Sequence, residues 1–178
     1  MNNYAAVTEP GTVEIQRLLP GPIERVWASL TESERRRKWL ASGEMDLRAG
    51  GEVHLHFHHA ELSPHREPIP ERYRSMENGH DSTGRIIECD PPRRLGFTWD
   101  ESDAAPSEVS FDLSVREDEV LLVVTHRRLA DRAAMLGVAG GWHTHLDILL
   151  DHLNGDVPRP FWATHTKMEA EYARRFEA

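Results

Sequence analysis

Three histidines of this 178-residue chain, His54, His56 and His58, alternate along one short segment. In an extended strand alternate side chains share a face, so the imidazoles would lie together, opposite the apolar side chains between them. A His-x-His pair on a strand supplies two ligands of the kind that zinc prefers. No cysteine and no clear acidic pattern nearby completes a zinc signature. The sequence therefore favours a solvent-exposed face without a metal, and a weak or adventitious metal site is the alternative.

His126 and His145 form a second pair with possible chemistry. His126 ends the most apolar segment of the chain, and His145 lies three residues after Trp142 on the flank of an apolar stripe. Both are predicted to point into the interior. A buried imidazole can orient a ligand carbonyl or act as an acid–base group near neutral pH. The alternative, which the sequence favours, is a core histidine bonded to backbone or to another side chain.

The familiar catalytic and cofactor motifs do not occur. The chain has no Gly-x-Ser-x-Gly elbow and no Cys–His signature, and the glycines at 137, 140 and 141 lack the strand and lysine of a phosphate loop. We therefore assign no catalytic residue, expect no cofactor, and expect binding rather than catalysis. The single cysteine, Cys89, excludes an intramolecular disulfide and fits a reducing compartment. Residues 1–11 show no signal-peptide pattern, so we expect a cytoplasmic protein.

Charge and hydropathy exclude two classes of partner. The net charge of −9 argues against nonspecific nucleic-acid binding, which requires a basic excess to neutralise phosphates. No apolar run approaches the roughly 20 residues that cross a bilayer, so membrane insertion is not expected.

The N-terminal part predicts one strand and two short helices. Alternation predicts a strand over residues 12–19, which Pro20-Gly21-Pro22 ends. Apolar residues at 23, 26, 27 and 30 then form one helix face. Thr31-x-x-Glu34 resembles a capping box that would open a second helix ending near Trp39. The basic run at 35–38 is expected to be a solvated face.

The middle of the chain predicts five more strands. Alternating apolar residues mark strands near 53–58, 84–89, 95–99, 109–115 and 120–126. Residues 59–80, rich in proline and charge, are expected to be a mobile connection or a flap.

Two helices are predicted at the C-terminal end. A long helix runs to about Asn154-Gly155 and carries an apolar stripe, formed by Trp142, Leu146, Leu149, Leu150 and Leu153. A second stripe, at 161, 165, 168, 172 and 176, predicts a final helix. It would pack on this chain or form a homodimer contact.

These elements predict an α+β fold of the helix-grip type. A curved antiparallel sheet of about six to seven strands would wrap a long C-terminal helix, with two short helices after the first strand. Such a sheet and one helix rarely fill the space between them, so a cavity is expected. We expect one domain over 12–155 and an extra helix over 156–178.

Several segments together carry a family resemblance. The sequence resembles proteins similar to the activator of the heat-shock-protein-90 ATPase, within the START-like helix-grip (SRPBCC) superfamily. The resemblance covers roughly residues 12–154 and rests on Pro22–Thr31, Lys38–Leu40, Asp46–Gly51, Arg94–Trp99, Leu121–His126 and Gly141-Trp142. It implies the fold and leaves the function open, because the superfamily includes lipid carriers, hormone receptors, aromatic cyclases and co-chaperones.

Three functions follow as hypotheses. The first is binding of a small apolar or amphipathic molecule in the cavity. The second is a cyclase- or hydrolase-like activity that uses His126 or His145, and the third is a co-chaperone-like interaction with a chaperone partner. The predicted ligand-binding residues are the apolar and imidazole side chains that should face the cavity: Trp39, Phe57, Phe97, Trp99, Phe111, Val124, His126, Trp142, His145, Leu146 and Leu149.

Overall fold

The computed structural model describes residues 1–101 and 104–177. Over these residues the strands form one seven-stranded antiparallel sheet in the spatial order β1-β2-β7-β6-β5-β4-β3. The strands are β1 (Ala6–Glu9), β2 (Thr12–Pro20), β3 (Glu52–Phe57), β4 (His80–Asp90), β5 (Arg94–Trp99), β6 (Ser107–Arg116) and β7 (Glu119–Arg127). The helices are α1 (Ile23–Thr31), α2 (Ser33–Arg36), α3 (Arg132–Asn154) and α4 (Phe161–Arg175), with 3-10 turns η1 (His59–Glu61) and η2 (Glu71–Met76). The predicted helix-grip class is confirmed.

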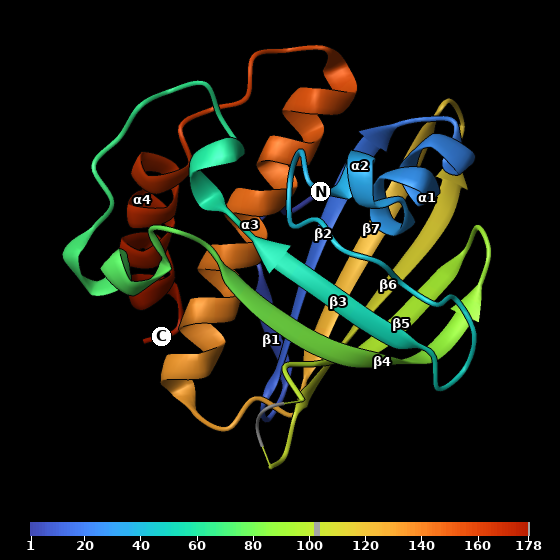
Figure 1. Cartoon of the computed structure of the whole chain (residues 1–178), viewed down its shortest axis with the longest axis horizontal. Coiled ribbons are helices and arrows are strands. Elements are labelled where there is room, and N and C mark those ends of the chain that lie inside the picture. Colours follow the sequence, from blue (N-terminus) through green and yellow to red (C-terminus); the bar gives the residue numbers. More distant parts are fainter. Residues whose placement is uncertain (102–103, 178) are drawn as a thin grey trace.

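The sheet curves around α3, and α4 lies on the side of α3 that faces away from the sheet (Figure 1). The α3 stripe residues Trp142, Leu146 and Leu149 are all buried against the sheet core. The helix begins after Asp131, whose carboxylate accepts a hydrogen bond of 2.8 Å from the Ala134 N–H. It ends at Gly155, whose φ of 78° is the left-handed conformation that glycine adopts without strain. None of the helices in the described residues is long and apolar enough to span a membrane.

The β3 strand shows why alternation predicts this sheet well. Val53, Leu55 and Phe57 are buried, whereas His54 and His56 are exposed on the other face. His54 and His56 lie beside carboxylates of Glu52 and Asp81, at 3.4 and 2.8 Å. Within the described part of the chain, no group of three or more His, Cys, Asp or Glu residues is placed to hold a metal ion.

Strand β1 was not predicted from the sequence. All four of its residues are exposed, so it carries no buried alternating face. It pairs with β2 at the edge of the sheet, with Val7 opposite Val13. The two short helices therefore follow the second strand of the chain rather than the first.

The predicted capping box is wrong. Thr31 is the last residue of α1, and its hydroxyl donates to the Trp27 carbonyl at 3.0 Å rather than capping a following helix. Helix α2 starts after Glu32 without a side-chain cap and ends at Arg36, before Trp39. A hydroxyl can bond back to the turn before it, and sequence spacing does not show which bond forms.

Arg36 also corrects the expectation that residues 35–38 form a solvated face. Its guanidinium is 1% exposed and donates to the carbonyls of Leu30, Thr31 and Ala41 at 3.1–3.2 Å, and to that of Gly43. Burial lowers the pKa of Arg36 to about 10, so the group keeps its charge at neutral pH. This side chain fixes the turn that leads from α2 to β3.

Residues 59–80 are held against α4 by specific contacts, in place of the mobile connection expected from the sequence. The Glu67 carboxylate accepts hydrogen bonds of 3.0 and 2.9 Å from the N–H groups of Trp162 and Ala163, in the first turn of α4. The Ser63 hydroxyl donates to the Pro158 carbonyl at 3.1 Å. Farther along, Tyr73 stacks on Trp162, with ring centroids 5.1 Å apart.

Helix α4 buries its apolar stripe inside this chain. Phe161, His165, Met168 and Tyr172 are buried, and α4 packs along α3. Charged groups fix the connection between the two helices. Arg159 donates to Asp147 at 2.9 Å and to Asp151 at 2.6 Å, and Asp147 also accepts from Arg17 of β2.

Candidate functional site

The site begins with a cavity of about 200 Å³ between α3, the sheet and the 59–80 segment, called here the inner cavity. It is lined by Leu40, Phe57, His59, Met76, His80, Trp99, His126, Gly137, Val138, Gly141, Trp142 and His145. Leu40 lies in the connection between α2 and β3, and the other residues come from β3, β4, β5, β7, α3 and both 3-10 turns. The packing of the sheet on α3 therefore positions most of the lining.

Aromatic rings form the walls of the inner cavity. Trp99 meets Trp142 edge to face at 5.4 Å between ring centroids, and Phe57 meets Trp99 in the same way at 5.8 Å. Edge-to-face pairs hold each ring at a fixed angle. The apolar lining is therefore a rigid surface suited to a flat apolar group.

Two glycines lie where the helix side of the inner cavity opens to solvent, Gly137 exposed and Gly141 half-buried. Gly137 and Gly141 are four residues apart on α3, so they lie on one face of the helix. A Cβ atom at either position would meet nothing within 4 Å. Neither glycine has a positive φ, so each keeps the cavity wide without serving a backbone turn.

Both ring nitrogens of His126 form hydrogen bonds within the protein. The Trp142 indole N–H donates to His126 Nδ1 at 3.1 Å, which makes Nδ1 the acceptor. The proton of the neutral ring is then on Nε2, which donates to the Ser107 hydroxyl at 2.7 Å. Burial lowers the pKa of His126 to about 4, so the ring is neutral at physiological pH. His126 therefore orients Trp142 and has no nitrogen left for a ligand.

His145 keeps one nitrogen for the cavity. Its Nδ1–H donates to the Trp39 carbonyl at 2.7 Å, so the neutral ring carries its lone pair on Nε2. Nε2 has no hydrogen-bond partner in the described residues. Burial lowers the pKa of His145 to about 4. The inner cavity thus offers a ligand one fixed hydrogen-bond acceptor.

His59 and His80 are site residues that sequence reasoning missed. Each has a buried Nδ1 without a hydrogen-bond partner in the described part of the chain. Burial lowers the pKa of His59 to about 3, helped by the neighbouring imidazoles of His145 and His80, and burial also lowers the pKa of His80. The signal was present in β3. Position 59 continues the buried alternation through 53, 55 and 57, and His80 pairs with Phe57 across the sheet.

The structure brings only part of the predicted site to the cavity. Phe57, Trp99, His126, Trp142 and His145 line it. The remaining predicted residues are buried in the core and do not line the inner cavity: Trp39, Phe97, Phe111, Val124, Leu146 and Leu149. They pack on one another, as Phe97 does on Phe111 with ring centroids 5.9 Å apart.

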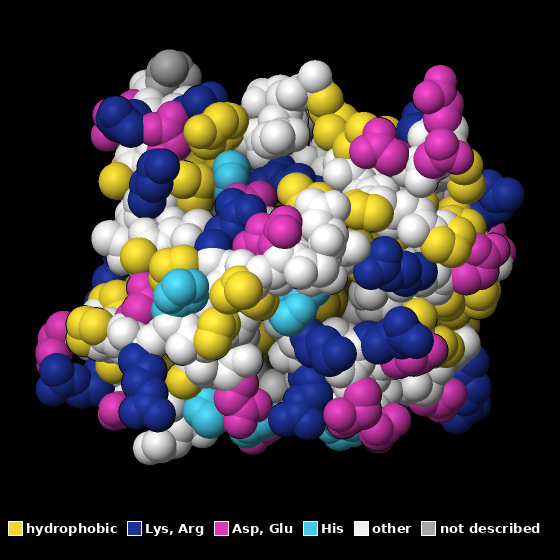
Figure 2. Space-filling model, turned by 90° about the horizontal axis from the view of Figure 1, so that it is seen from above, with side chains coloured by type: hydrophobic (Ala, Val, Ile, Leu, Met, Phe, Trp, Pro, Cys, Tyr) yellow, Lys and Arg dark blue, Asp and Glu magenta, His cyan; other side chains and the backbone are white. Residues whose placement is uncertain are grey.

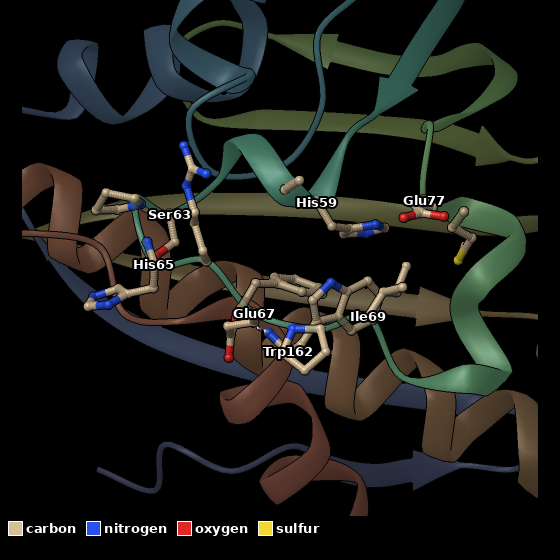
Figure 3. Close-up of a pocket in the computed structure, with 13 residues that line it drawn as sticks. His59, Ser63, His65, Glu67, Ile69, Glu77 and Trp162 are labelled. Carbon is tan, nitrogen blue, oxygen red and sulfur yellow. Dashed lines mark hydrogen bonds between the residues drawn. The ribbon is translucent and has the colours of Figure 1, made fainter.

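A second cavity of about 400 Å³, the outer cavity, lies between the 59–77 segment and the start of α4 (Figure 3). Phe161, Trp162 and Ile69 supply its apolar surface, and Arg66 and Glu77 supply charged groups of opposite sign. His59 and Met76 line both cavities.

Comparisons place this chain in a known family and fold. A family profile described as "Activator of Hsp90 ATPase homolog 1-like protein" matches residues 20–154. No curated protein sequence matches the chain. A Bordetella parapertussis protein solved by NMR is 45% identical, with a TM-score of 0.82 over 98% of this chain and 91% of that chain.

Two more distant solved structures share the fold. CalU16 from Micromonospora echinospora is 24% identical, with a TM-score of 0.68 over 96% of this chain and 93% of that chain. DynU16, described as a putative protein in the dynemicin biosynthetic locus, is 16% identical, with a TM-score of 0.64 over 83% of this chain and 49% of that chain. By its profile match and its fold, the chain belongs to the Activator of Hsp90 ATPase homolog 1-like family, within the START-like helix-grip superfamily.

Proposed function

We propose that this protein binds a small apolar or amphipathic molecule in the inner cavity. The observation that carries the proposal is an aromatic-walled space whose helix side is held open by Gly137 and Gly141. Gly137 is exposed and Gly141 is half-buried, so the space opens to solvent at this end and a ligand can enter there. A bound apolar group would gain dispersion contacts with the aromatic walls.

The size of the cavity sets the size of the group that enters it. An engineered apolar cavity of about 150 Å³ holds benzene, so about 200 Å³ fits a single ring with a short substituent. A donor on that substituent, such as a hydroxyl or an amide N–H, would meet the lone pair on His145 Nε2. The expected ligand part is therefore one ring with a hydrogen-bond donor.

Toluene binding to matched α3 variants tests the proposal. Gly141→Leu would place a side chain in the cavity and should abolish toluene binding, as followed by amide chemical shifts in NMR spectra. Gly140→Ala is the control, because Gly140 is adjacent but faces Glu169 of α4, where a Cβ makes ordinary contacts at 3.7 Å. Toluene binding that survives Gly141→Leu, or that the unaltered protein lacks, would rule the proposal out.

Acid–base catalysis by His145 is the second candidate, and the free Nε2 is the observation that favours it. A general base works best when its pKa lies near the working pH, whereas burial lowers the pKa of His145 to about 4. Such a nitrogen accepts a hydrogen bond more readily than it removes a proton. A ligand-orienting role for His145 therefore ranks above a cyclase- or hydrolase-like one.

A co-chaperone-like role ranks third. Figure 2 shows acidic and basic side chains interspersed over the face that it presents, with apolar side chains in scattered groups. A protein-docking site is more often marked by a continuous apolar patch. The face in Figure 2 therefore gives no specific support for a chaperone partner.

A further inference from the structure

His59 forms the partition between the two cavities. Its ring centroid lies 5.7 Å from that of His145, on the inner side. On the outer side it lies 4.6 Å from the ring of Phe161 and 5.1 Å from that of Trp162 (Figure 3). A single imidazole, together with the flexible side chain of Met76, therefore separates the two spaces.

His59 has hydrogen-bonding capacity that the protein does not use. The side chain is 8% exposed, and its buried Nδ1 has no partner among the described residues. A neutral imidazole has one donor and one acceptor nitrogen, and leaving a buried polar atom unpaired is destabilising. A ligand group that accepts a hydrogen bond, donates one, or does both would pair with the His59 ring at the partition.

The walls of the outer cavity combine an apolar strip with polar and charged groups. Trp162 and Ile69 provide apolar surface. The acidic group nearest α4, Glu67, is already bonded to two backbone N–H groups of that helix. Arg66, Glu67 and Glu77 all line the cavity, so its charged groups are two acidic and one basic, and they disfavour an anionic occupant. An alkyl or acyl chain that lies along the apolar strip gains by burying its methylene groups there.

We propose that the inner and outer cavities form one extended site for an elongated amphipathic molecule. A single ring occupies the inner cavity, a neutral amide- or ester-like group bonds to His59 at the partition, and an alkyl or acyl chain lies along Trp162 and Ile69 in the outer cavity. This inference rests on the proposed function of the inner cavity and extends it to a ligand class.

Three probes of graded length test the extended site by titration of the full chain. Toluene reports on the inner cavity, benzamide adds the polar group, and N-hexylbenzamide adds the chain. N-hexylbenzamide should bind more tightly than benzamide, by about fourfold for each methylene that the outer cavity buries. The two variants that block one cavity each are Gly141→Leu for the inner cavity and Ala60→Trp for the outer one, where Ala60 lines only the outer space.

The expected pattern separates the two cavities. Ala60→Trp should reduce the affinity for N-hexylbenzamide to that for benzamide, and should leave toluene and benzamide binding within about twofold. Gly141→Leu should abolish binding of all three probes. His59→Phe keeps a ring but removes both nitrogens, so it should weaken the two amides about tenfold more than it weakens toluene.

Three results would overturn the inference in different ways. If Ala60→Trp leaves N-hexylbenzamide binding unchanged, the outer cavity is not part of the site, while toluene binding still upholds the proposed function. If N-hexylbenzamide still binds Gly141→Leu, the cavities are separate sites. If the unaltered protein does not bind toluene, the proposed function fails and the extension fails with it.

Discussion

The indole N–H of Trp142 donates to Nδ1 of His126 over 3.1 Å, across the interface between α3 and β7. This bond fixes the tautomer of a buried imidazole and the orientation of a cavity wall at the same time. It also divides the two interior histidines by role, because His126 is fully bonded within the protein whereas His145 keeps one nitrogen for a ligand.

Replacing His126 should therefore destabilise the protein through lost packing and lost hydrogen bonds. His126→Ala leaves the Trp142 N–H unpaired and opens a cavity, so the free energy of unfolding should fall by about 3 kcal/mol in urea titrations. Ser107→Ala removes only the hydrogen bond to Nε2 and should cost about 1 kcal/mol. Equal costs for the two variants would contradict the role assigned to the Trp142 bond.

The buried imidazoles should make the protein sensitive to mild acid. Burial lowers the pKa of His59 to about 3 and the pKa values of His126 and His145 to about 4. The unfolded chain binds these protons near pH 6.5, and the folded chain does not until the pH falls to these lower values. Stability should therefore be unaffected above about pH 6.5 and decline below it, by about 1.4 kcal/mol per pH unit for each imidazole.

Urea unfolding at about pH 7 and about pH 5.5 measures this decline. These three histidines predict a loss of about 4 kcal/mol between the two conditions, and His80, whose pKa burial also lowers, adds to it. His59→Phe removes one titrating ring and should reduce that loss by about 1.4 kcal/mol. A free energy of unfolding that does not change over this interval would show that the rings are not buried as neutral groups.

Arg36 should be among the residues on which folding depends most. Arg36→Met keeps much of the length but leaves the carbonyls of Leu30, Thr31 and Ala41 without their donor, which should cost about 3 kcal/mol or more. Arg35→Met is the matched control, because Arg35 is exposed and, among the residues that the structure describes, pairs with Glu32 at the surface. Its effect should stay within about 0.5 kcal/mol in the same urea titration.

Glu67 should hold the first turn of α4 in place. Glu67→Ala removes the acceptor for the N–H groups of Trp162 and Ala163 and should cost about 1 kcal/mol, as the loss of a helix cap does. Hydrogen exchange at these two amides should accelerate. Glu71→Ala, which removes an exposed carboxylate paired with Arg74, should leave that exchange unchanged.

The sequence predicts most of the sheet because each long strand buries one face. Alternation marks β3 through Val53, Leu55 and Phe57, and it fails for β1, where every residue is exposed. Arg36 could not be recognised as buried, because the carbonyls that bind it come from a turn whose path depends on the finished fold. From the sequence alone, a buried arginine within a run of charged residues cannot be distinguished from a solvent-exposed one.

The site was harder to predict than the fold for a different reason. Alternation indicates that Phe97 and Phe111 face inward, but not whether they meet each other or a cavity, and in the structure they meet each other. The cavity depends instead on side chains that are missing, at Gly137 and Gly141. Its outer extension depends on residues 59–80, whose proline and charge content resembles that of a flexible loop.

The contacts between Glu67 and the start of α4 join residues about 95 positions apart. Every residue that lines the inner cavity lies before position 146, whereas the outer cavity needs Phe161 and Trp162 for one of its walls. During synthesis, the chain that can form the inner cavity therefore leaves the ribosome before the chain that completes the outer one.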